Sequence, residues 1–154
     1  MSTSEDRAEV LEANQRFYEA FAERNIESME ALWSRSAPVA CIHPGWGPLR
    51  DREQVMASWT GILGNAGAPR IRCSRATAHV MGDAAFVVCE EMVESARLVA
   101  TNMFVREGGS WKIVHHQASP IAHEVVSLVE GDADDDGDGD EDSGETGDPG
   151  DKLN

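Results

Sequence analysis

The chain has 154 residues, 41% hydrophobic and 27% charged, a composition that excludes a disordered or membrane-embedded chain as a description of the whole. Its 28 acidic residues outnumber the 13 Lys and Arg residues, which gives a formal net charge of −15. Contacts with phosphate need clustered Lys and Arg, and these residues are scattered here, so we expect no nucleic-acid binding.

Three segments in the first half of the chain have the three- and four-residue apolar spacing of an amphipathic helix. Thr3 or Ser4 is a suitable cap for the first, and Asp51 followed by Gln54 has the spacing of a capping box before the third. Pro38 ends the second, because a proline disfavours helical backbone in the residue before it. The predicted helices cover residues 3–25, 26–33 and 51–63.

Alternation with a period of two dominates the chain after Pro69 and predicts strands. Glycine turns at Gly82 and Gly109 are spaced as hairpins, so neighbouring strands should be antiparallel. An earlier short run ends at a loop, residues 44–48, whose two Pro and two Gly exclude regular structure. The β-type runs cover about residues 39–43, 71–81, 84–93, 98–106 and 111–118. This order predicts an α+β fold, with three N-terminal helices packed on one face of a strongly curved antiparallel sheet.

The chain divides by composition into a domain, residues 1–124, and an acidic tail, residues 125–154. Residues 131–154 hold eleven Asp and Glu against one Lys and almost nothing apolar, so we expect the tail to be disordered. The run from Asp134 to Glu145 matches the spacing of a calcium-binding loop, but a tract this rich in Asp and Gly produces such matches readily, and Pro149 excludes the helix that should follow. We expect the tail to provide solubility or contact with a basic partner.

The three cysteines, Cys41, Cys73 and Cys89, are odd in number, form no Cys-x-x-Cys pair and lie in apolar runs. They are predicted to be reduced, buried thiols; Cys41 shares a strand face with His43, but nothing nearby would activate it as a nucleophile. The first residues are acidic where a secretion signal is basic, and no run reaches 18 apolar residues. The protein is therefore predicted to be cytoplasmic, with no contact to a membrane.

The order of the predicted elements resembles the nuclear transport factor 2 superfamily, and especially its SnoaL-like and ketosteroid-isomerase-like bacterial members. The resemblance covers about residues 5–120 and rests on short motifs. These are Gln15-Arg16-Phe17-Tyr18, Leu32-Trp33, Cys41-Ile42-His43-Pro44-Gly45, the helix start from Asp51 to Trp59, Thr101-Asn102-Met103-Phe104, and the ending Trp111-Lys112-Ile113-Val114-His115-His116. It implies a cone with a mostly apolar pocket and a homodimer formed through the outer face of the sheet. The ending also resembles the association domain of calcium/calmodulin-dependent kinase, which shares the fold and performs no chemistry.

Two polar residues are the catalytic candidates that the resemblance implies. His43 stands before a proline where the isomerases have their proton-transferring Asp, and a neutral imidazole is a suitable base. Asn102 matches the acid that donates a hydrogen bond to the oxyanion, and an amide donates as well. The tyrosine donor of the isomerases aligns with Phe17, which has no hydrogen to donate, and Tyr18 points about 100° away around the helix. The alternatives are a loop-entry histidine that bonds a backbone group, and an asparagine that fastens an internal network.

Aromatic side chains are predicted to line the pocket, although the same residues would also form an ordinary core. The predicted ligand-binding residues are Phe17, Phe21, Trp46, Trp59, Phe104 and His115. His115 and His116 are consecutive on a strand and face opposite sides, so one points to the pocket and the other away, and the sequence leaves open which. No histidine spacing typical of a metal site occurs, so neither a metal nor another cofactor is expected.

These observations lead to the hypothesis of a SnoaL-like homodimer that binds a small apolar organic ligand. Its chemistry would be that of a cofactor-independent isomerase or cyclase, which moves a proton next to a carbonyl group. The alternative is a non-catalytic member of the same fold, which serves as a dimerising or ligand-sequestering module.

Overall fold

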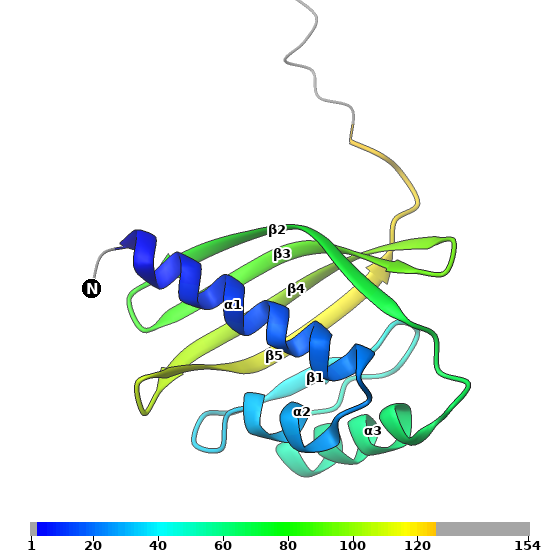
Figure 1. The fold of residues 1–154 in the computed structure, drawn as a ribbon, viewed down its shortest axis with the longest axis horizontal. Helices are drawn as coiled ribbons and strands as arrows, with labels where there is room; N and C mark the ends of the chain where they lie inside the picture. Colours follow the sequence, from blue (N-terminus) through cyan, green and yellow to red (C-terminus); the bar gives the residue numbers. More distant parts are fainter. Residues whose placement is uncertain (1–2, 126–154) are drawn as a thin grey trace, which may run out of the picture. The chain divides into compact units, whose positions relative to one another are not determined.

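The computed structural model describes residues 3–125, which fold into three helices and one five-stranded sheet (Figure 1). The helices are α1 (Thr3–Ala22), α2 (Ile26–Leu32) and α3 (Arg52–Gly64). The strands are β1 (Ala40–Ile42), β2 (Ile71–Met81), β3 (Ala84–Val93), β4 (Ala96–Glu107) and β5 (Ser110–Pro120). The predicted α+β class and every predicted helix and strand are confirmed, with bounds that differ by a few residues.

The sheet is mixed, which corrects the prediction of an antiparallel sheet. Its order is β1-β5-β4-β3-β2, and the four long strands are antiparallel neighbours as predicted. The short strand β1 instead pairs parallel with β5, with Cys41 opposite His116. Pattern and turn signals give no information on this pairing, because β1 and β5 are far apart in the sequence and no hairpin joins them. The strong curvature of the sheet stays a prediction.

Helix α1 crosses one face of the sheet, and α2 and α3 lie near β1 (Figure 1). The buried side of α1 includes Val10, Phe17 and Phe21, and it packs against the inward side chains of the strands. Asn14 and Tyr18 lie on the same buried side of the helix. The apolar spacing that predicts this helix therefore places two polar groups in the core.

A β-bulge in β5 changes which residues face the helices. Met103 of β4 is opposite His115, whereas Phe104 is opposite Ile113, so Val114 is an extra residue in β5. Trp111 and Ile113 face inward before the bulge, and His116 faces inward after it. Strict alternation from Ile113 would have placed His115 in the interior.

The loop before α3 is closed at its base and capped at its end. Cys41 and Leu49 exchange two backbone hydrogen bonds, of 2.9 and 2.8 Å, which brings the ends of the Pro- and Gly-rich loop together. Asp51 is the N-cap of α3, and its Oδ1 accepts a hydrogen bond from the Gln54 backbone N–H at 2.8 Å. The Gln54 side chain returns to accept from the Arg50 N–H at 2.9 Å, one residue before its partner in a standard capping box. These contacts fix the position of His43 at the start of the loop.

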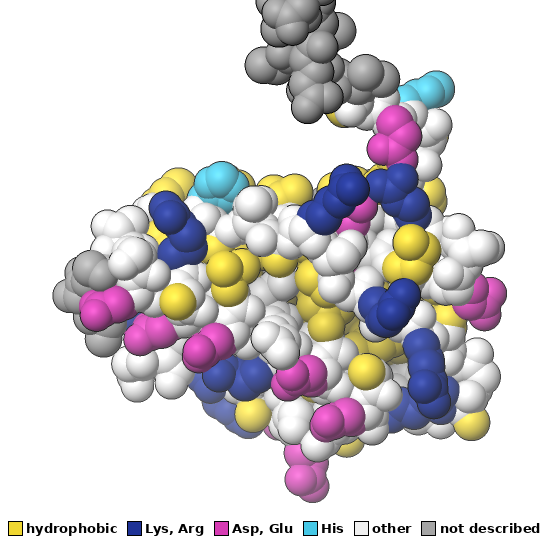
Figure 2. All heavy atoms as spheres, turned by 45° about the horizontal axis from the view of Figure 1, so that its top comes forward, with side chains coloured by type: hydrophobic (Ala, Val, Ile, Leu, Met, Phe, Trp, Pro, Cys, Tyr) yellow, Lys and Arg dark blue, Asp and Glu magenta, His cyan; other side chains and the backbone are white. Residues whose placement is uncertain are grey.

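The predicted tail and its calcium-loop pattern lie outside the described residues, apart from the first residue of the tail, Val125. Within residues 3–125, no helix is both long enough and apolar enough to cross a membrane. Figure 2 shows Lys, Arg, Asp and Glu side chains spread over one face of the molecule.

Candidate functional site

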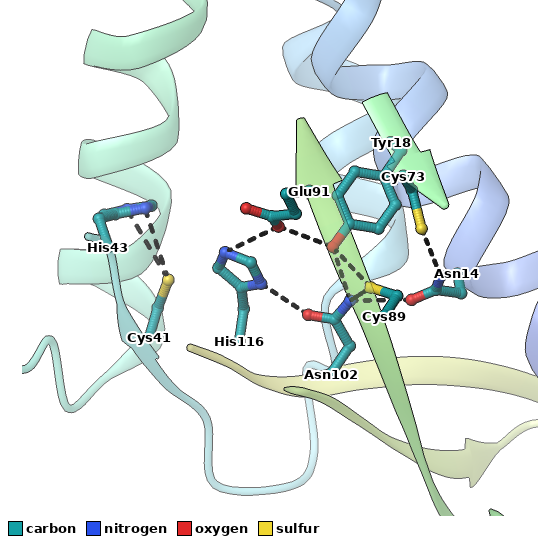
Figure 3. Close-up of polar contacts among 9 residues, drawn as sticks. All are labelled: Asn14, Tyr18, Cys41, His43, Cys73, Cys89, Glu91, Asn102 and His116. Atoms are coloured by element: carbon teal, nitrogen blue, oxygen red, sulfur yellow. Dashed lines mark hydrogen bonds and ion pairs between the residues drawn. The ribbon is translucent and has the colours of Figure 1, made fainter. Parts of the chain in front are cut away.

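The interior contains a set of polar side chains, which we call the interior polar cluster (Figure 3). Its members come from α1, from the loop after β1, and from all five strands. They are Asn14, Tyr18, Cys41, His43, Cys73, Cys89, Glu91, Asn102 and His116. All are buried except Cys73, which is half-buried. A polar group in such surroundings is costly unless it is hydrogen-bonded, so each contact of the cluster carries structural information.

Asn102 is the centre of the cluster, and its amide is fully used by the protein. Its Oδ1 accepts a hydrogen bond from His116 Nδ1–H at 2.6 Å. Its Nδ2 donates one hydrogen to Asn14 Oδ1 at 2.8 Å and the other to the Tyr18 hydroxyl at 3.1 Å. A ligand oxygen would therefore have to displace a protein acceptor before Asn102 could donate to it.

Tyr18 and Glu91 form the acidic end of the cluster. The Tyr18 hydroxyl donates to Glu91 Oε1 at 2.7 Å. Burial, followed by the negative charge of Glu91, raises the pKa of Tyr18, and burial raises the pKa of Glu91. The phenol consequently stays protonated, and the neutral form of the Glu91 carboxyl is favoured more than it would be in water.

His116 is a neutral imidazole whose tautomer is set by Asn102. Because Oδ1 of an amide is only an acceptor, His116 Nδ1 must carry the hydrogen, and the lone pair is on Nε2. Burial is the largest cause that lowers the pKa of His116 to about 3. Its Nε2 lies 3.9 Å from Glu91 Oε1, and since the imidazole is neutral near pH 7, this contact is not a salt bridge there.

His43 is a second neutral imidazole, and its orientation is set by Ser58 of α3. The Ser58 hydroxyl donates to the Val55 carbonyl at 2.7 Å, so it must accept the 2.9 Å hydrogen bond from His43 Nε2–H. The lone pair of His43 is therefore on Nδ1. Burial lowers the pKa of His43 to about 4, so the ring is free to accept a proton at neutral pH.

Cys41 is a buried, protonated thiol, as the sequence predicts. Its Sγ lies 3.7 Å from His43 Nε2 and 3.9 Å from Nδ1, the nitrogen that can accept from the thiol, and burial raises the pKa of Cys41 to about 12. At the other end of the cluster, Asn14 Nδ2 donates to Cys73 Sγ at 3.7 Å. Cys89 Sγ lies 3.3 Å from the Tyr18 hydroxyl.

Aromatic rings enclose the two histidines. The His43 and His116 rings are 6.3 Å apart between centroids, and Trp59 lies 4.7 Å from the first and 6.0 Å from the second. Phe17 packs 5.1 Å from His116, and Phe21 packs 5.6 Å from Trp59. Four of the six residues predicted to bind a ligand, Phe17, Phe21, Trp46 and Trp59, thus surround one site with His43.

The remaining predicted residues lie in different surroundings. Phe104 is buried on β4, opposite Ile113. His115 is half-buried, and its Nδ1 lies 3.1 Å from the Ala40 carbonyl, while its neighbour His116 is the one in the interior. His43 and Asn102 both lie near His116, which hydrogen-bonds Asn102 and whose ring centroid is 6.3 Å from that of His43. The ligand and catalytic roles of these residues stay predictions.

An open groove on the surface is lined by two residues that contact His43, Trp46 and Ser58. It has a volume of about 590 Å³ and is lined by residues of α3 and of the loop before it, among them Trp46, Leu49, Ser58 and Ile62. Trp46 is 50% exposed and packs 4.8 Å from the His43 ring. Ser58 is shared by the groove and by the hydrogen bond to His43.

Several members of the site were not predicted from the sequence. Two of them, Glu91 and Asn14, are visible in the sequence as polar residues that interrupt an apolar pattern. In β3 the inward series is Ala85, Val87, Cys89 and Glu91, so a charged residue continues an apolar alternation. Asn14 interrupts the apolar side of the first helix in the same way. The contact of Ser58 with His43 depends on how α3 packs, so no local pattern predicts it. The inward orientation of His116 rather than His115 depends on the bulge in β5, which the sequence pattern does not reveal either. Within residues 3–125 no group of three His, Cys, Asp or Glu side chains is placed to hold a metal ion.

Comparison with known proteins gives consistent matches. A family model for the SnoaL-like domain matches residues 10–123. A solved structure named as a candidate dehydratase of the NTF2-like family, from Streptomyces avermitilis, is 30% identical, with a TM-score of 0.73 over 79% of this chain and 100% of that chain. A candidate calcium/calmodulin-dependent kinase association domain from Thiobacillus denitrificans is 34% identical, with a TM-score of 0.63 over 71% of this chain and 92% of that chain.

Two further matches are less similar in sequence: one supports the fold alone, and the other covers part of a longer protein. A candidate ketosteroid isomerase from Parabacteroides distasonis is 16% identical, with a TM-score of 0.60 over 73% of this chain and 86% of that chain. The F-box protein SKIP8 of Arabidopsis thaliana is 24% identical over 112 residues, which are 71% of this chain and 48% of that protein. The chain thus spans about half the length of this curated relative.

The two depressed histidine pKa values predict how stability depends on pH. In the unfolded chain both histidines take up protons below about pH 6.5, whereas the folded state resists this down to about pH 4 for His43 and about pH 3 for His116. The free energy of unfolding should therefore fall as the pH falls through this range, by at most about 1.4 kcal/mol per pH unit for each histidine.

The variant His116→Gln, which keeps a donor for Asn102, should show a shallower dependence in urea titrations between these pH values. The raised pKa of Glu91 acts with the opposite sign, and the lowered pKa values of surface groups such as Glu90 act with the same sign, so the difference between wild type and variant is the informative quantity. Equal slopes would contradict the assignment of His116 as a buried neutral ring.

Proposed function

The chain belongs to the SnoaL-like domain family, and we propose from this premise that it binds a small, largely apolar organic molecule and moves a proton next to its carbonyl group, without a cofactor. The observation that carries the proposal is a buried imidazole, His43, which packs against Trp46 and Trp59 and bonds Ser58 on the wall of an open groove. Burial lowers the pKa of His43 to about 4, so the ring is a neutral base near pH 7, and burial raises the pKa of Glu91 in the same interior.

His43 supports the role of base through three features of its surroundings. Its hydrogen bond to Ser58 leaves the lone pair on Nδ1, its neighbour Trp46 lies on the groove wall, and the ring is only 4% exposed. Nδ1 would take a proton from the carbon next to the carbonyl group, and the electron pair of that bond would move onto the carbonyl oxygen. Return of the proton to another carbon completes an isomerisation.

Two related outcomes use the same first step. If a hydroxyl group is attached one carbon further on, its departure as water after protonation completes a dehydration. The 30% identity to a structure named as a candidate dehydratase supports this variant. If the carbanion attacks a second carbonyl carbon of the same molecule, the π pair of that carbonyl moves onto its oxygen, which takes the proton back from His43, and the product is a ring. The residues described here serve all three outcomes equally, since each begins with the proton that His43 removes.

A second candidate function is a non-catalytic module of the same fold. The observation that favours it is the packing of the interior, where Phe17, Trp59 and Phe104 are each only 1% exposed. In that case the interior polar cluster serves stability alone, and the groove next to His43 is a surface feature. The 34% identity to a candidate kinase association domain also favours this reading.

We also propose a homodimer, formed through the face of the sheet opposite the helices. Met103 and Val99 are each 37% exposed there, and Met103 is opposite Phe86 on one side and His115 on the other. The exposed apolar side chains Val99 and Met103, with Phe86 on the adjacent strand, are typical of a surface that a second chain covers.

Light scattering tests the dimer. The wild-type chain should have the mass of a dimer, and Met103→Glu should shift it to a monomer, because a charge would be buried in the interface. Met81→Glu, a matched change at a 55% exposed methionine near the end of β2, should leave the dimer intact. A wild-type monomer would overturn this proposal.

Proton transfer itself is tested by hydrogen–deuterium exchange next to the carbonyl group. A panel of cyclic ketones and enones in D₂O is followed by NMR with the wild-type chain, His43→Gln and His79→Gln, the last being an exposed histidine on β2. We expect catalysed exchange that falls about 100-fold or more in His43→Gln and is unchanged in His79→Gln. The acid limb of the rate profile should lie near pH 4, where the pKa of His43 lies.

No exchange above the buffer rate with any member of the panel would reject the enzymatic proposal in favour of the non-catalytic module. Exchange that survives in His43→Gln would reject His43 as the base.

A further inference from the structure

Three buried tryptophan side chains have an indole N–H without a hydrogen-bond partner within residues 3–125. They are Trp33, Trp59 and Trp111, each 3% exposed or less. An indole N–H is a donor only, so no change of tautomer or protonation can relieve it. A buried donor of this kind needs an explanation, because nearly all such groups in folded proteins are paired.

Trp59 differs from the other two in what surrounds it. Its ring lies between His43, 4.7 Å away, and His116, 6.0 Å away, and it is the aromatic residue shared by both histidines. Trp111 lies under the Arg106 guanidinium, 4.4 Å from its ring, and Trp33 forms a backbone bridge with Ile113. Only Trp59 among the three packs against the proposed base.

The nitrogen and oxygen donors of the cluster near His43 already have acceptors in the protein, and the protonated Cys41 thiol lies against the His43 ring, 3.9 Å from Nδ1. Asn102 donates both amide hydrogens, to Asn14 and Tyr18. The Tyr18 hydroxyl donates to Glu91, and the Ser58 hydroxyl donates to the Val55 carbonyl. A ligand oxygen could accept a hydrogen bond from Asn102, Tyr18 or Ser58 only if one of these bonds were broken. The Trp59 N–H could be used without breaking any bond.

We propose that Trp59 Nε1–H is the donor of an oxygen-binding subsite, which holds the carbonyl oxygen of the ligand while His43 acts on the adjacent carbon. This inference rests on the proposed function and narrows its substrate class. The interior polar cluster contains no Lys or Arg, and its two imidazoles are neutral near pH 7, so it offers no positive charge to bind a carboxylate or a phosphate. The fitting ligand is an uncharged ketone or enone with an apolar body.

The role follows the charge that develops in the reaction. As the electron pair moves onto the carbonyl oxygen, that oxygen becomes a stronger acceptor, and a fixed N–H donor in an apolar site stabilises it more in the transition state than in the ground state. The edge-to-face packing of Trp59 against Phe17, Phe21 and His43 fixes the ring, so little reorganisation is needed.

The test uses 2-cyclohexenone as the probe and cyclohexene, which has the same ring without the oxygen, as its control. In the ¹⁵N-labelled wild-type chain, 2-cyclohexenone should shift the Trp59 indole N–H resonance downfield and leave those of Trp33 and Trp111 in place. Cyclohexene should not produce the downfield shift. This measurement needs no variant, so it does not depend on how a substitution affects folding.

The matched variants are Trp59→Phe and Trp111→Phe, which each remove one unpaired N–H and keep an aromatic ring. We expect Trp59→Phe to bind 2-cyclohexenone about five- to tenfold more weakly and to slow its exchange about 100-fold, as for loss of one oxyanion donor. Its affinity for cyclohexene should change less than about twofold, and Trp111→Phe should match the wild-type chain in all three measurements.

The outcomes separate this inference from the proposed function. Exchange that depends on His43 but is unchanged in Trp59→Phe, with no shift of the Trp59 resonance, overturns the subsite and leaves the proton transfer in place. A shifted Trp59 resonance without exchange supports the subsite and rejects proton transfer. If 2-cyclohexenone neither binds nor exchanges, the subsite is rejected together with the enzymatic proposal for this substrate class.

Discussion

The hydrogen bonds of one buried amide, that of Asn102, tie together the parts of the molecule on which the site depends. Three bonds run from it to Asn14 and Tyr18 on α1 and to His116 on β5. Each bonded group is buried, and a buried polar group that loses its partner costs about 1–3 kcal/mol. The same side chain thus ties α1 to β4 and sets the tautomer of His116.

Asn102 is also the middle link of a chain of hydrogen bonds that runs from His116 to Glu91. His116 donates to Asn102, Asn102 donates to Tyr18, and Tyr18 donates to Glu91. Outside this chain, His43 donates to Ser58, so a lone pair is left on Nε2 of His116 and on Nδ1 of His43, and the Trp59 N–H is a separate unpaired donor within residues 3–125. Burial keeps the imidazoles neutral near pH 7, and it favours the protonated carboxyl for the same physical reason, since both forms are uncharged. An uncharged ligand is compatible with such an interior.

The fold was largely predictable from the sequence, whereas the site was predictable only in part. Periodicity and turn residues predicted the helices and the long strands, and the polar Asn102 in an apolar alternation marked the centre of the cluster correctly as a residue in need of partners. Three features depend on contacts between distant segments and gave no local signal: the parallel pairing of β1 with β5, the bulge at Val114 that turns His116 inward, and the packing that brings Ser58 to His43. Glu91 did leave a signal, as a charged residue in the inward series of β3, but the pattern alone names no partner for it.

The protonation states of the two buried histidines test the account most directly, by ¹⁵N NMR of their ring nitrogens in the full chain from neutral pH down to about pH 5. Both rings should stay neutral over this range, with the hydrogen on Nδ1 in His116 and on Nε2 in His43. A second proton taken up by either ring near the ordinary histidine pKa of about 6.5, or a His116 hydrogen on Nε2, would contradict it.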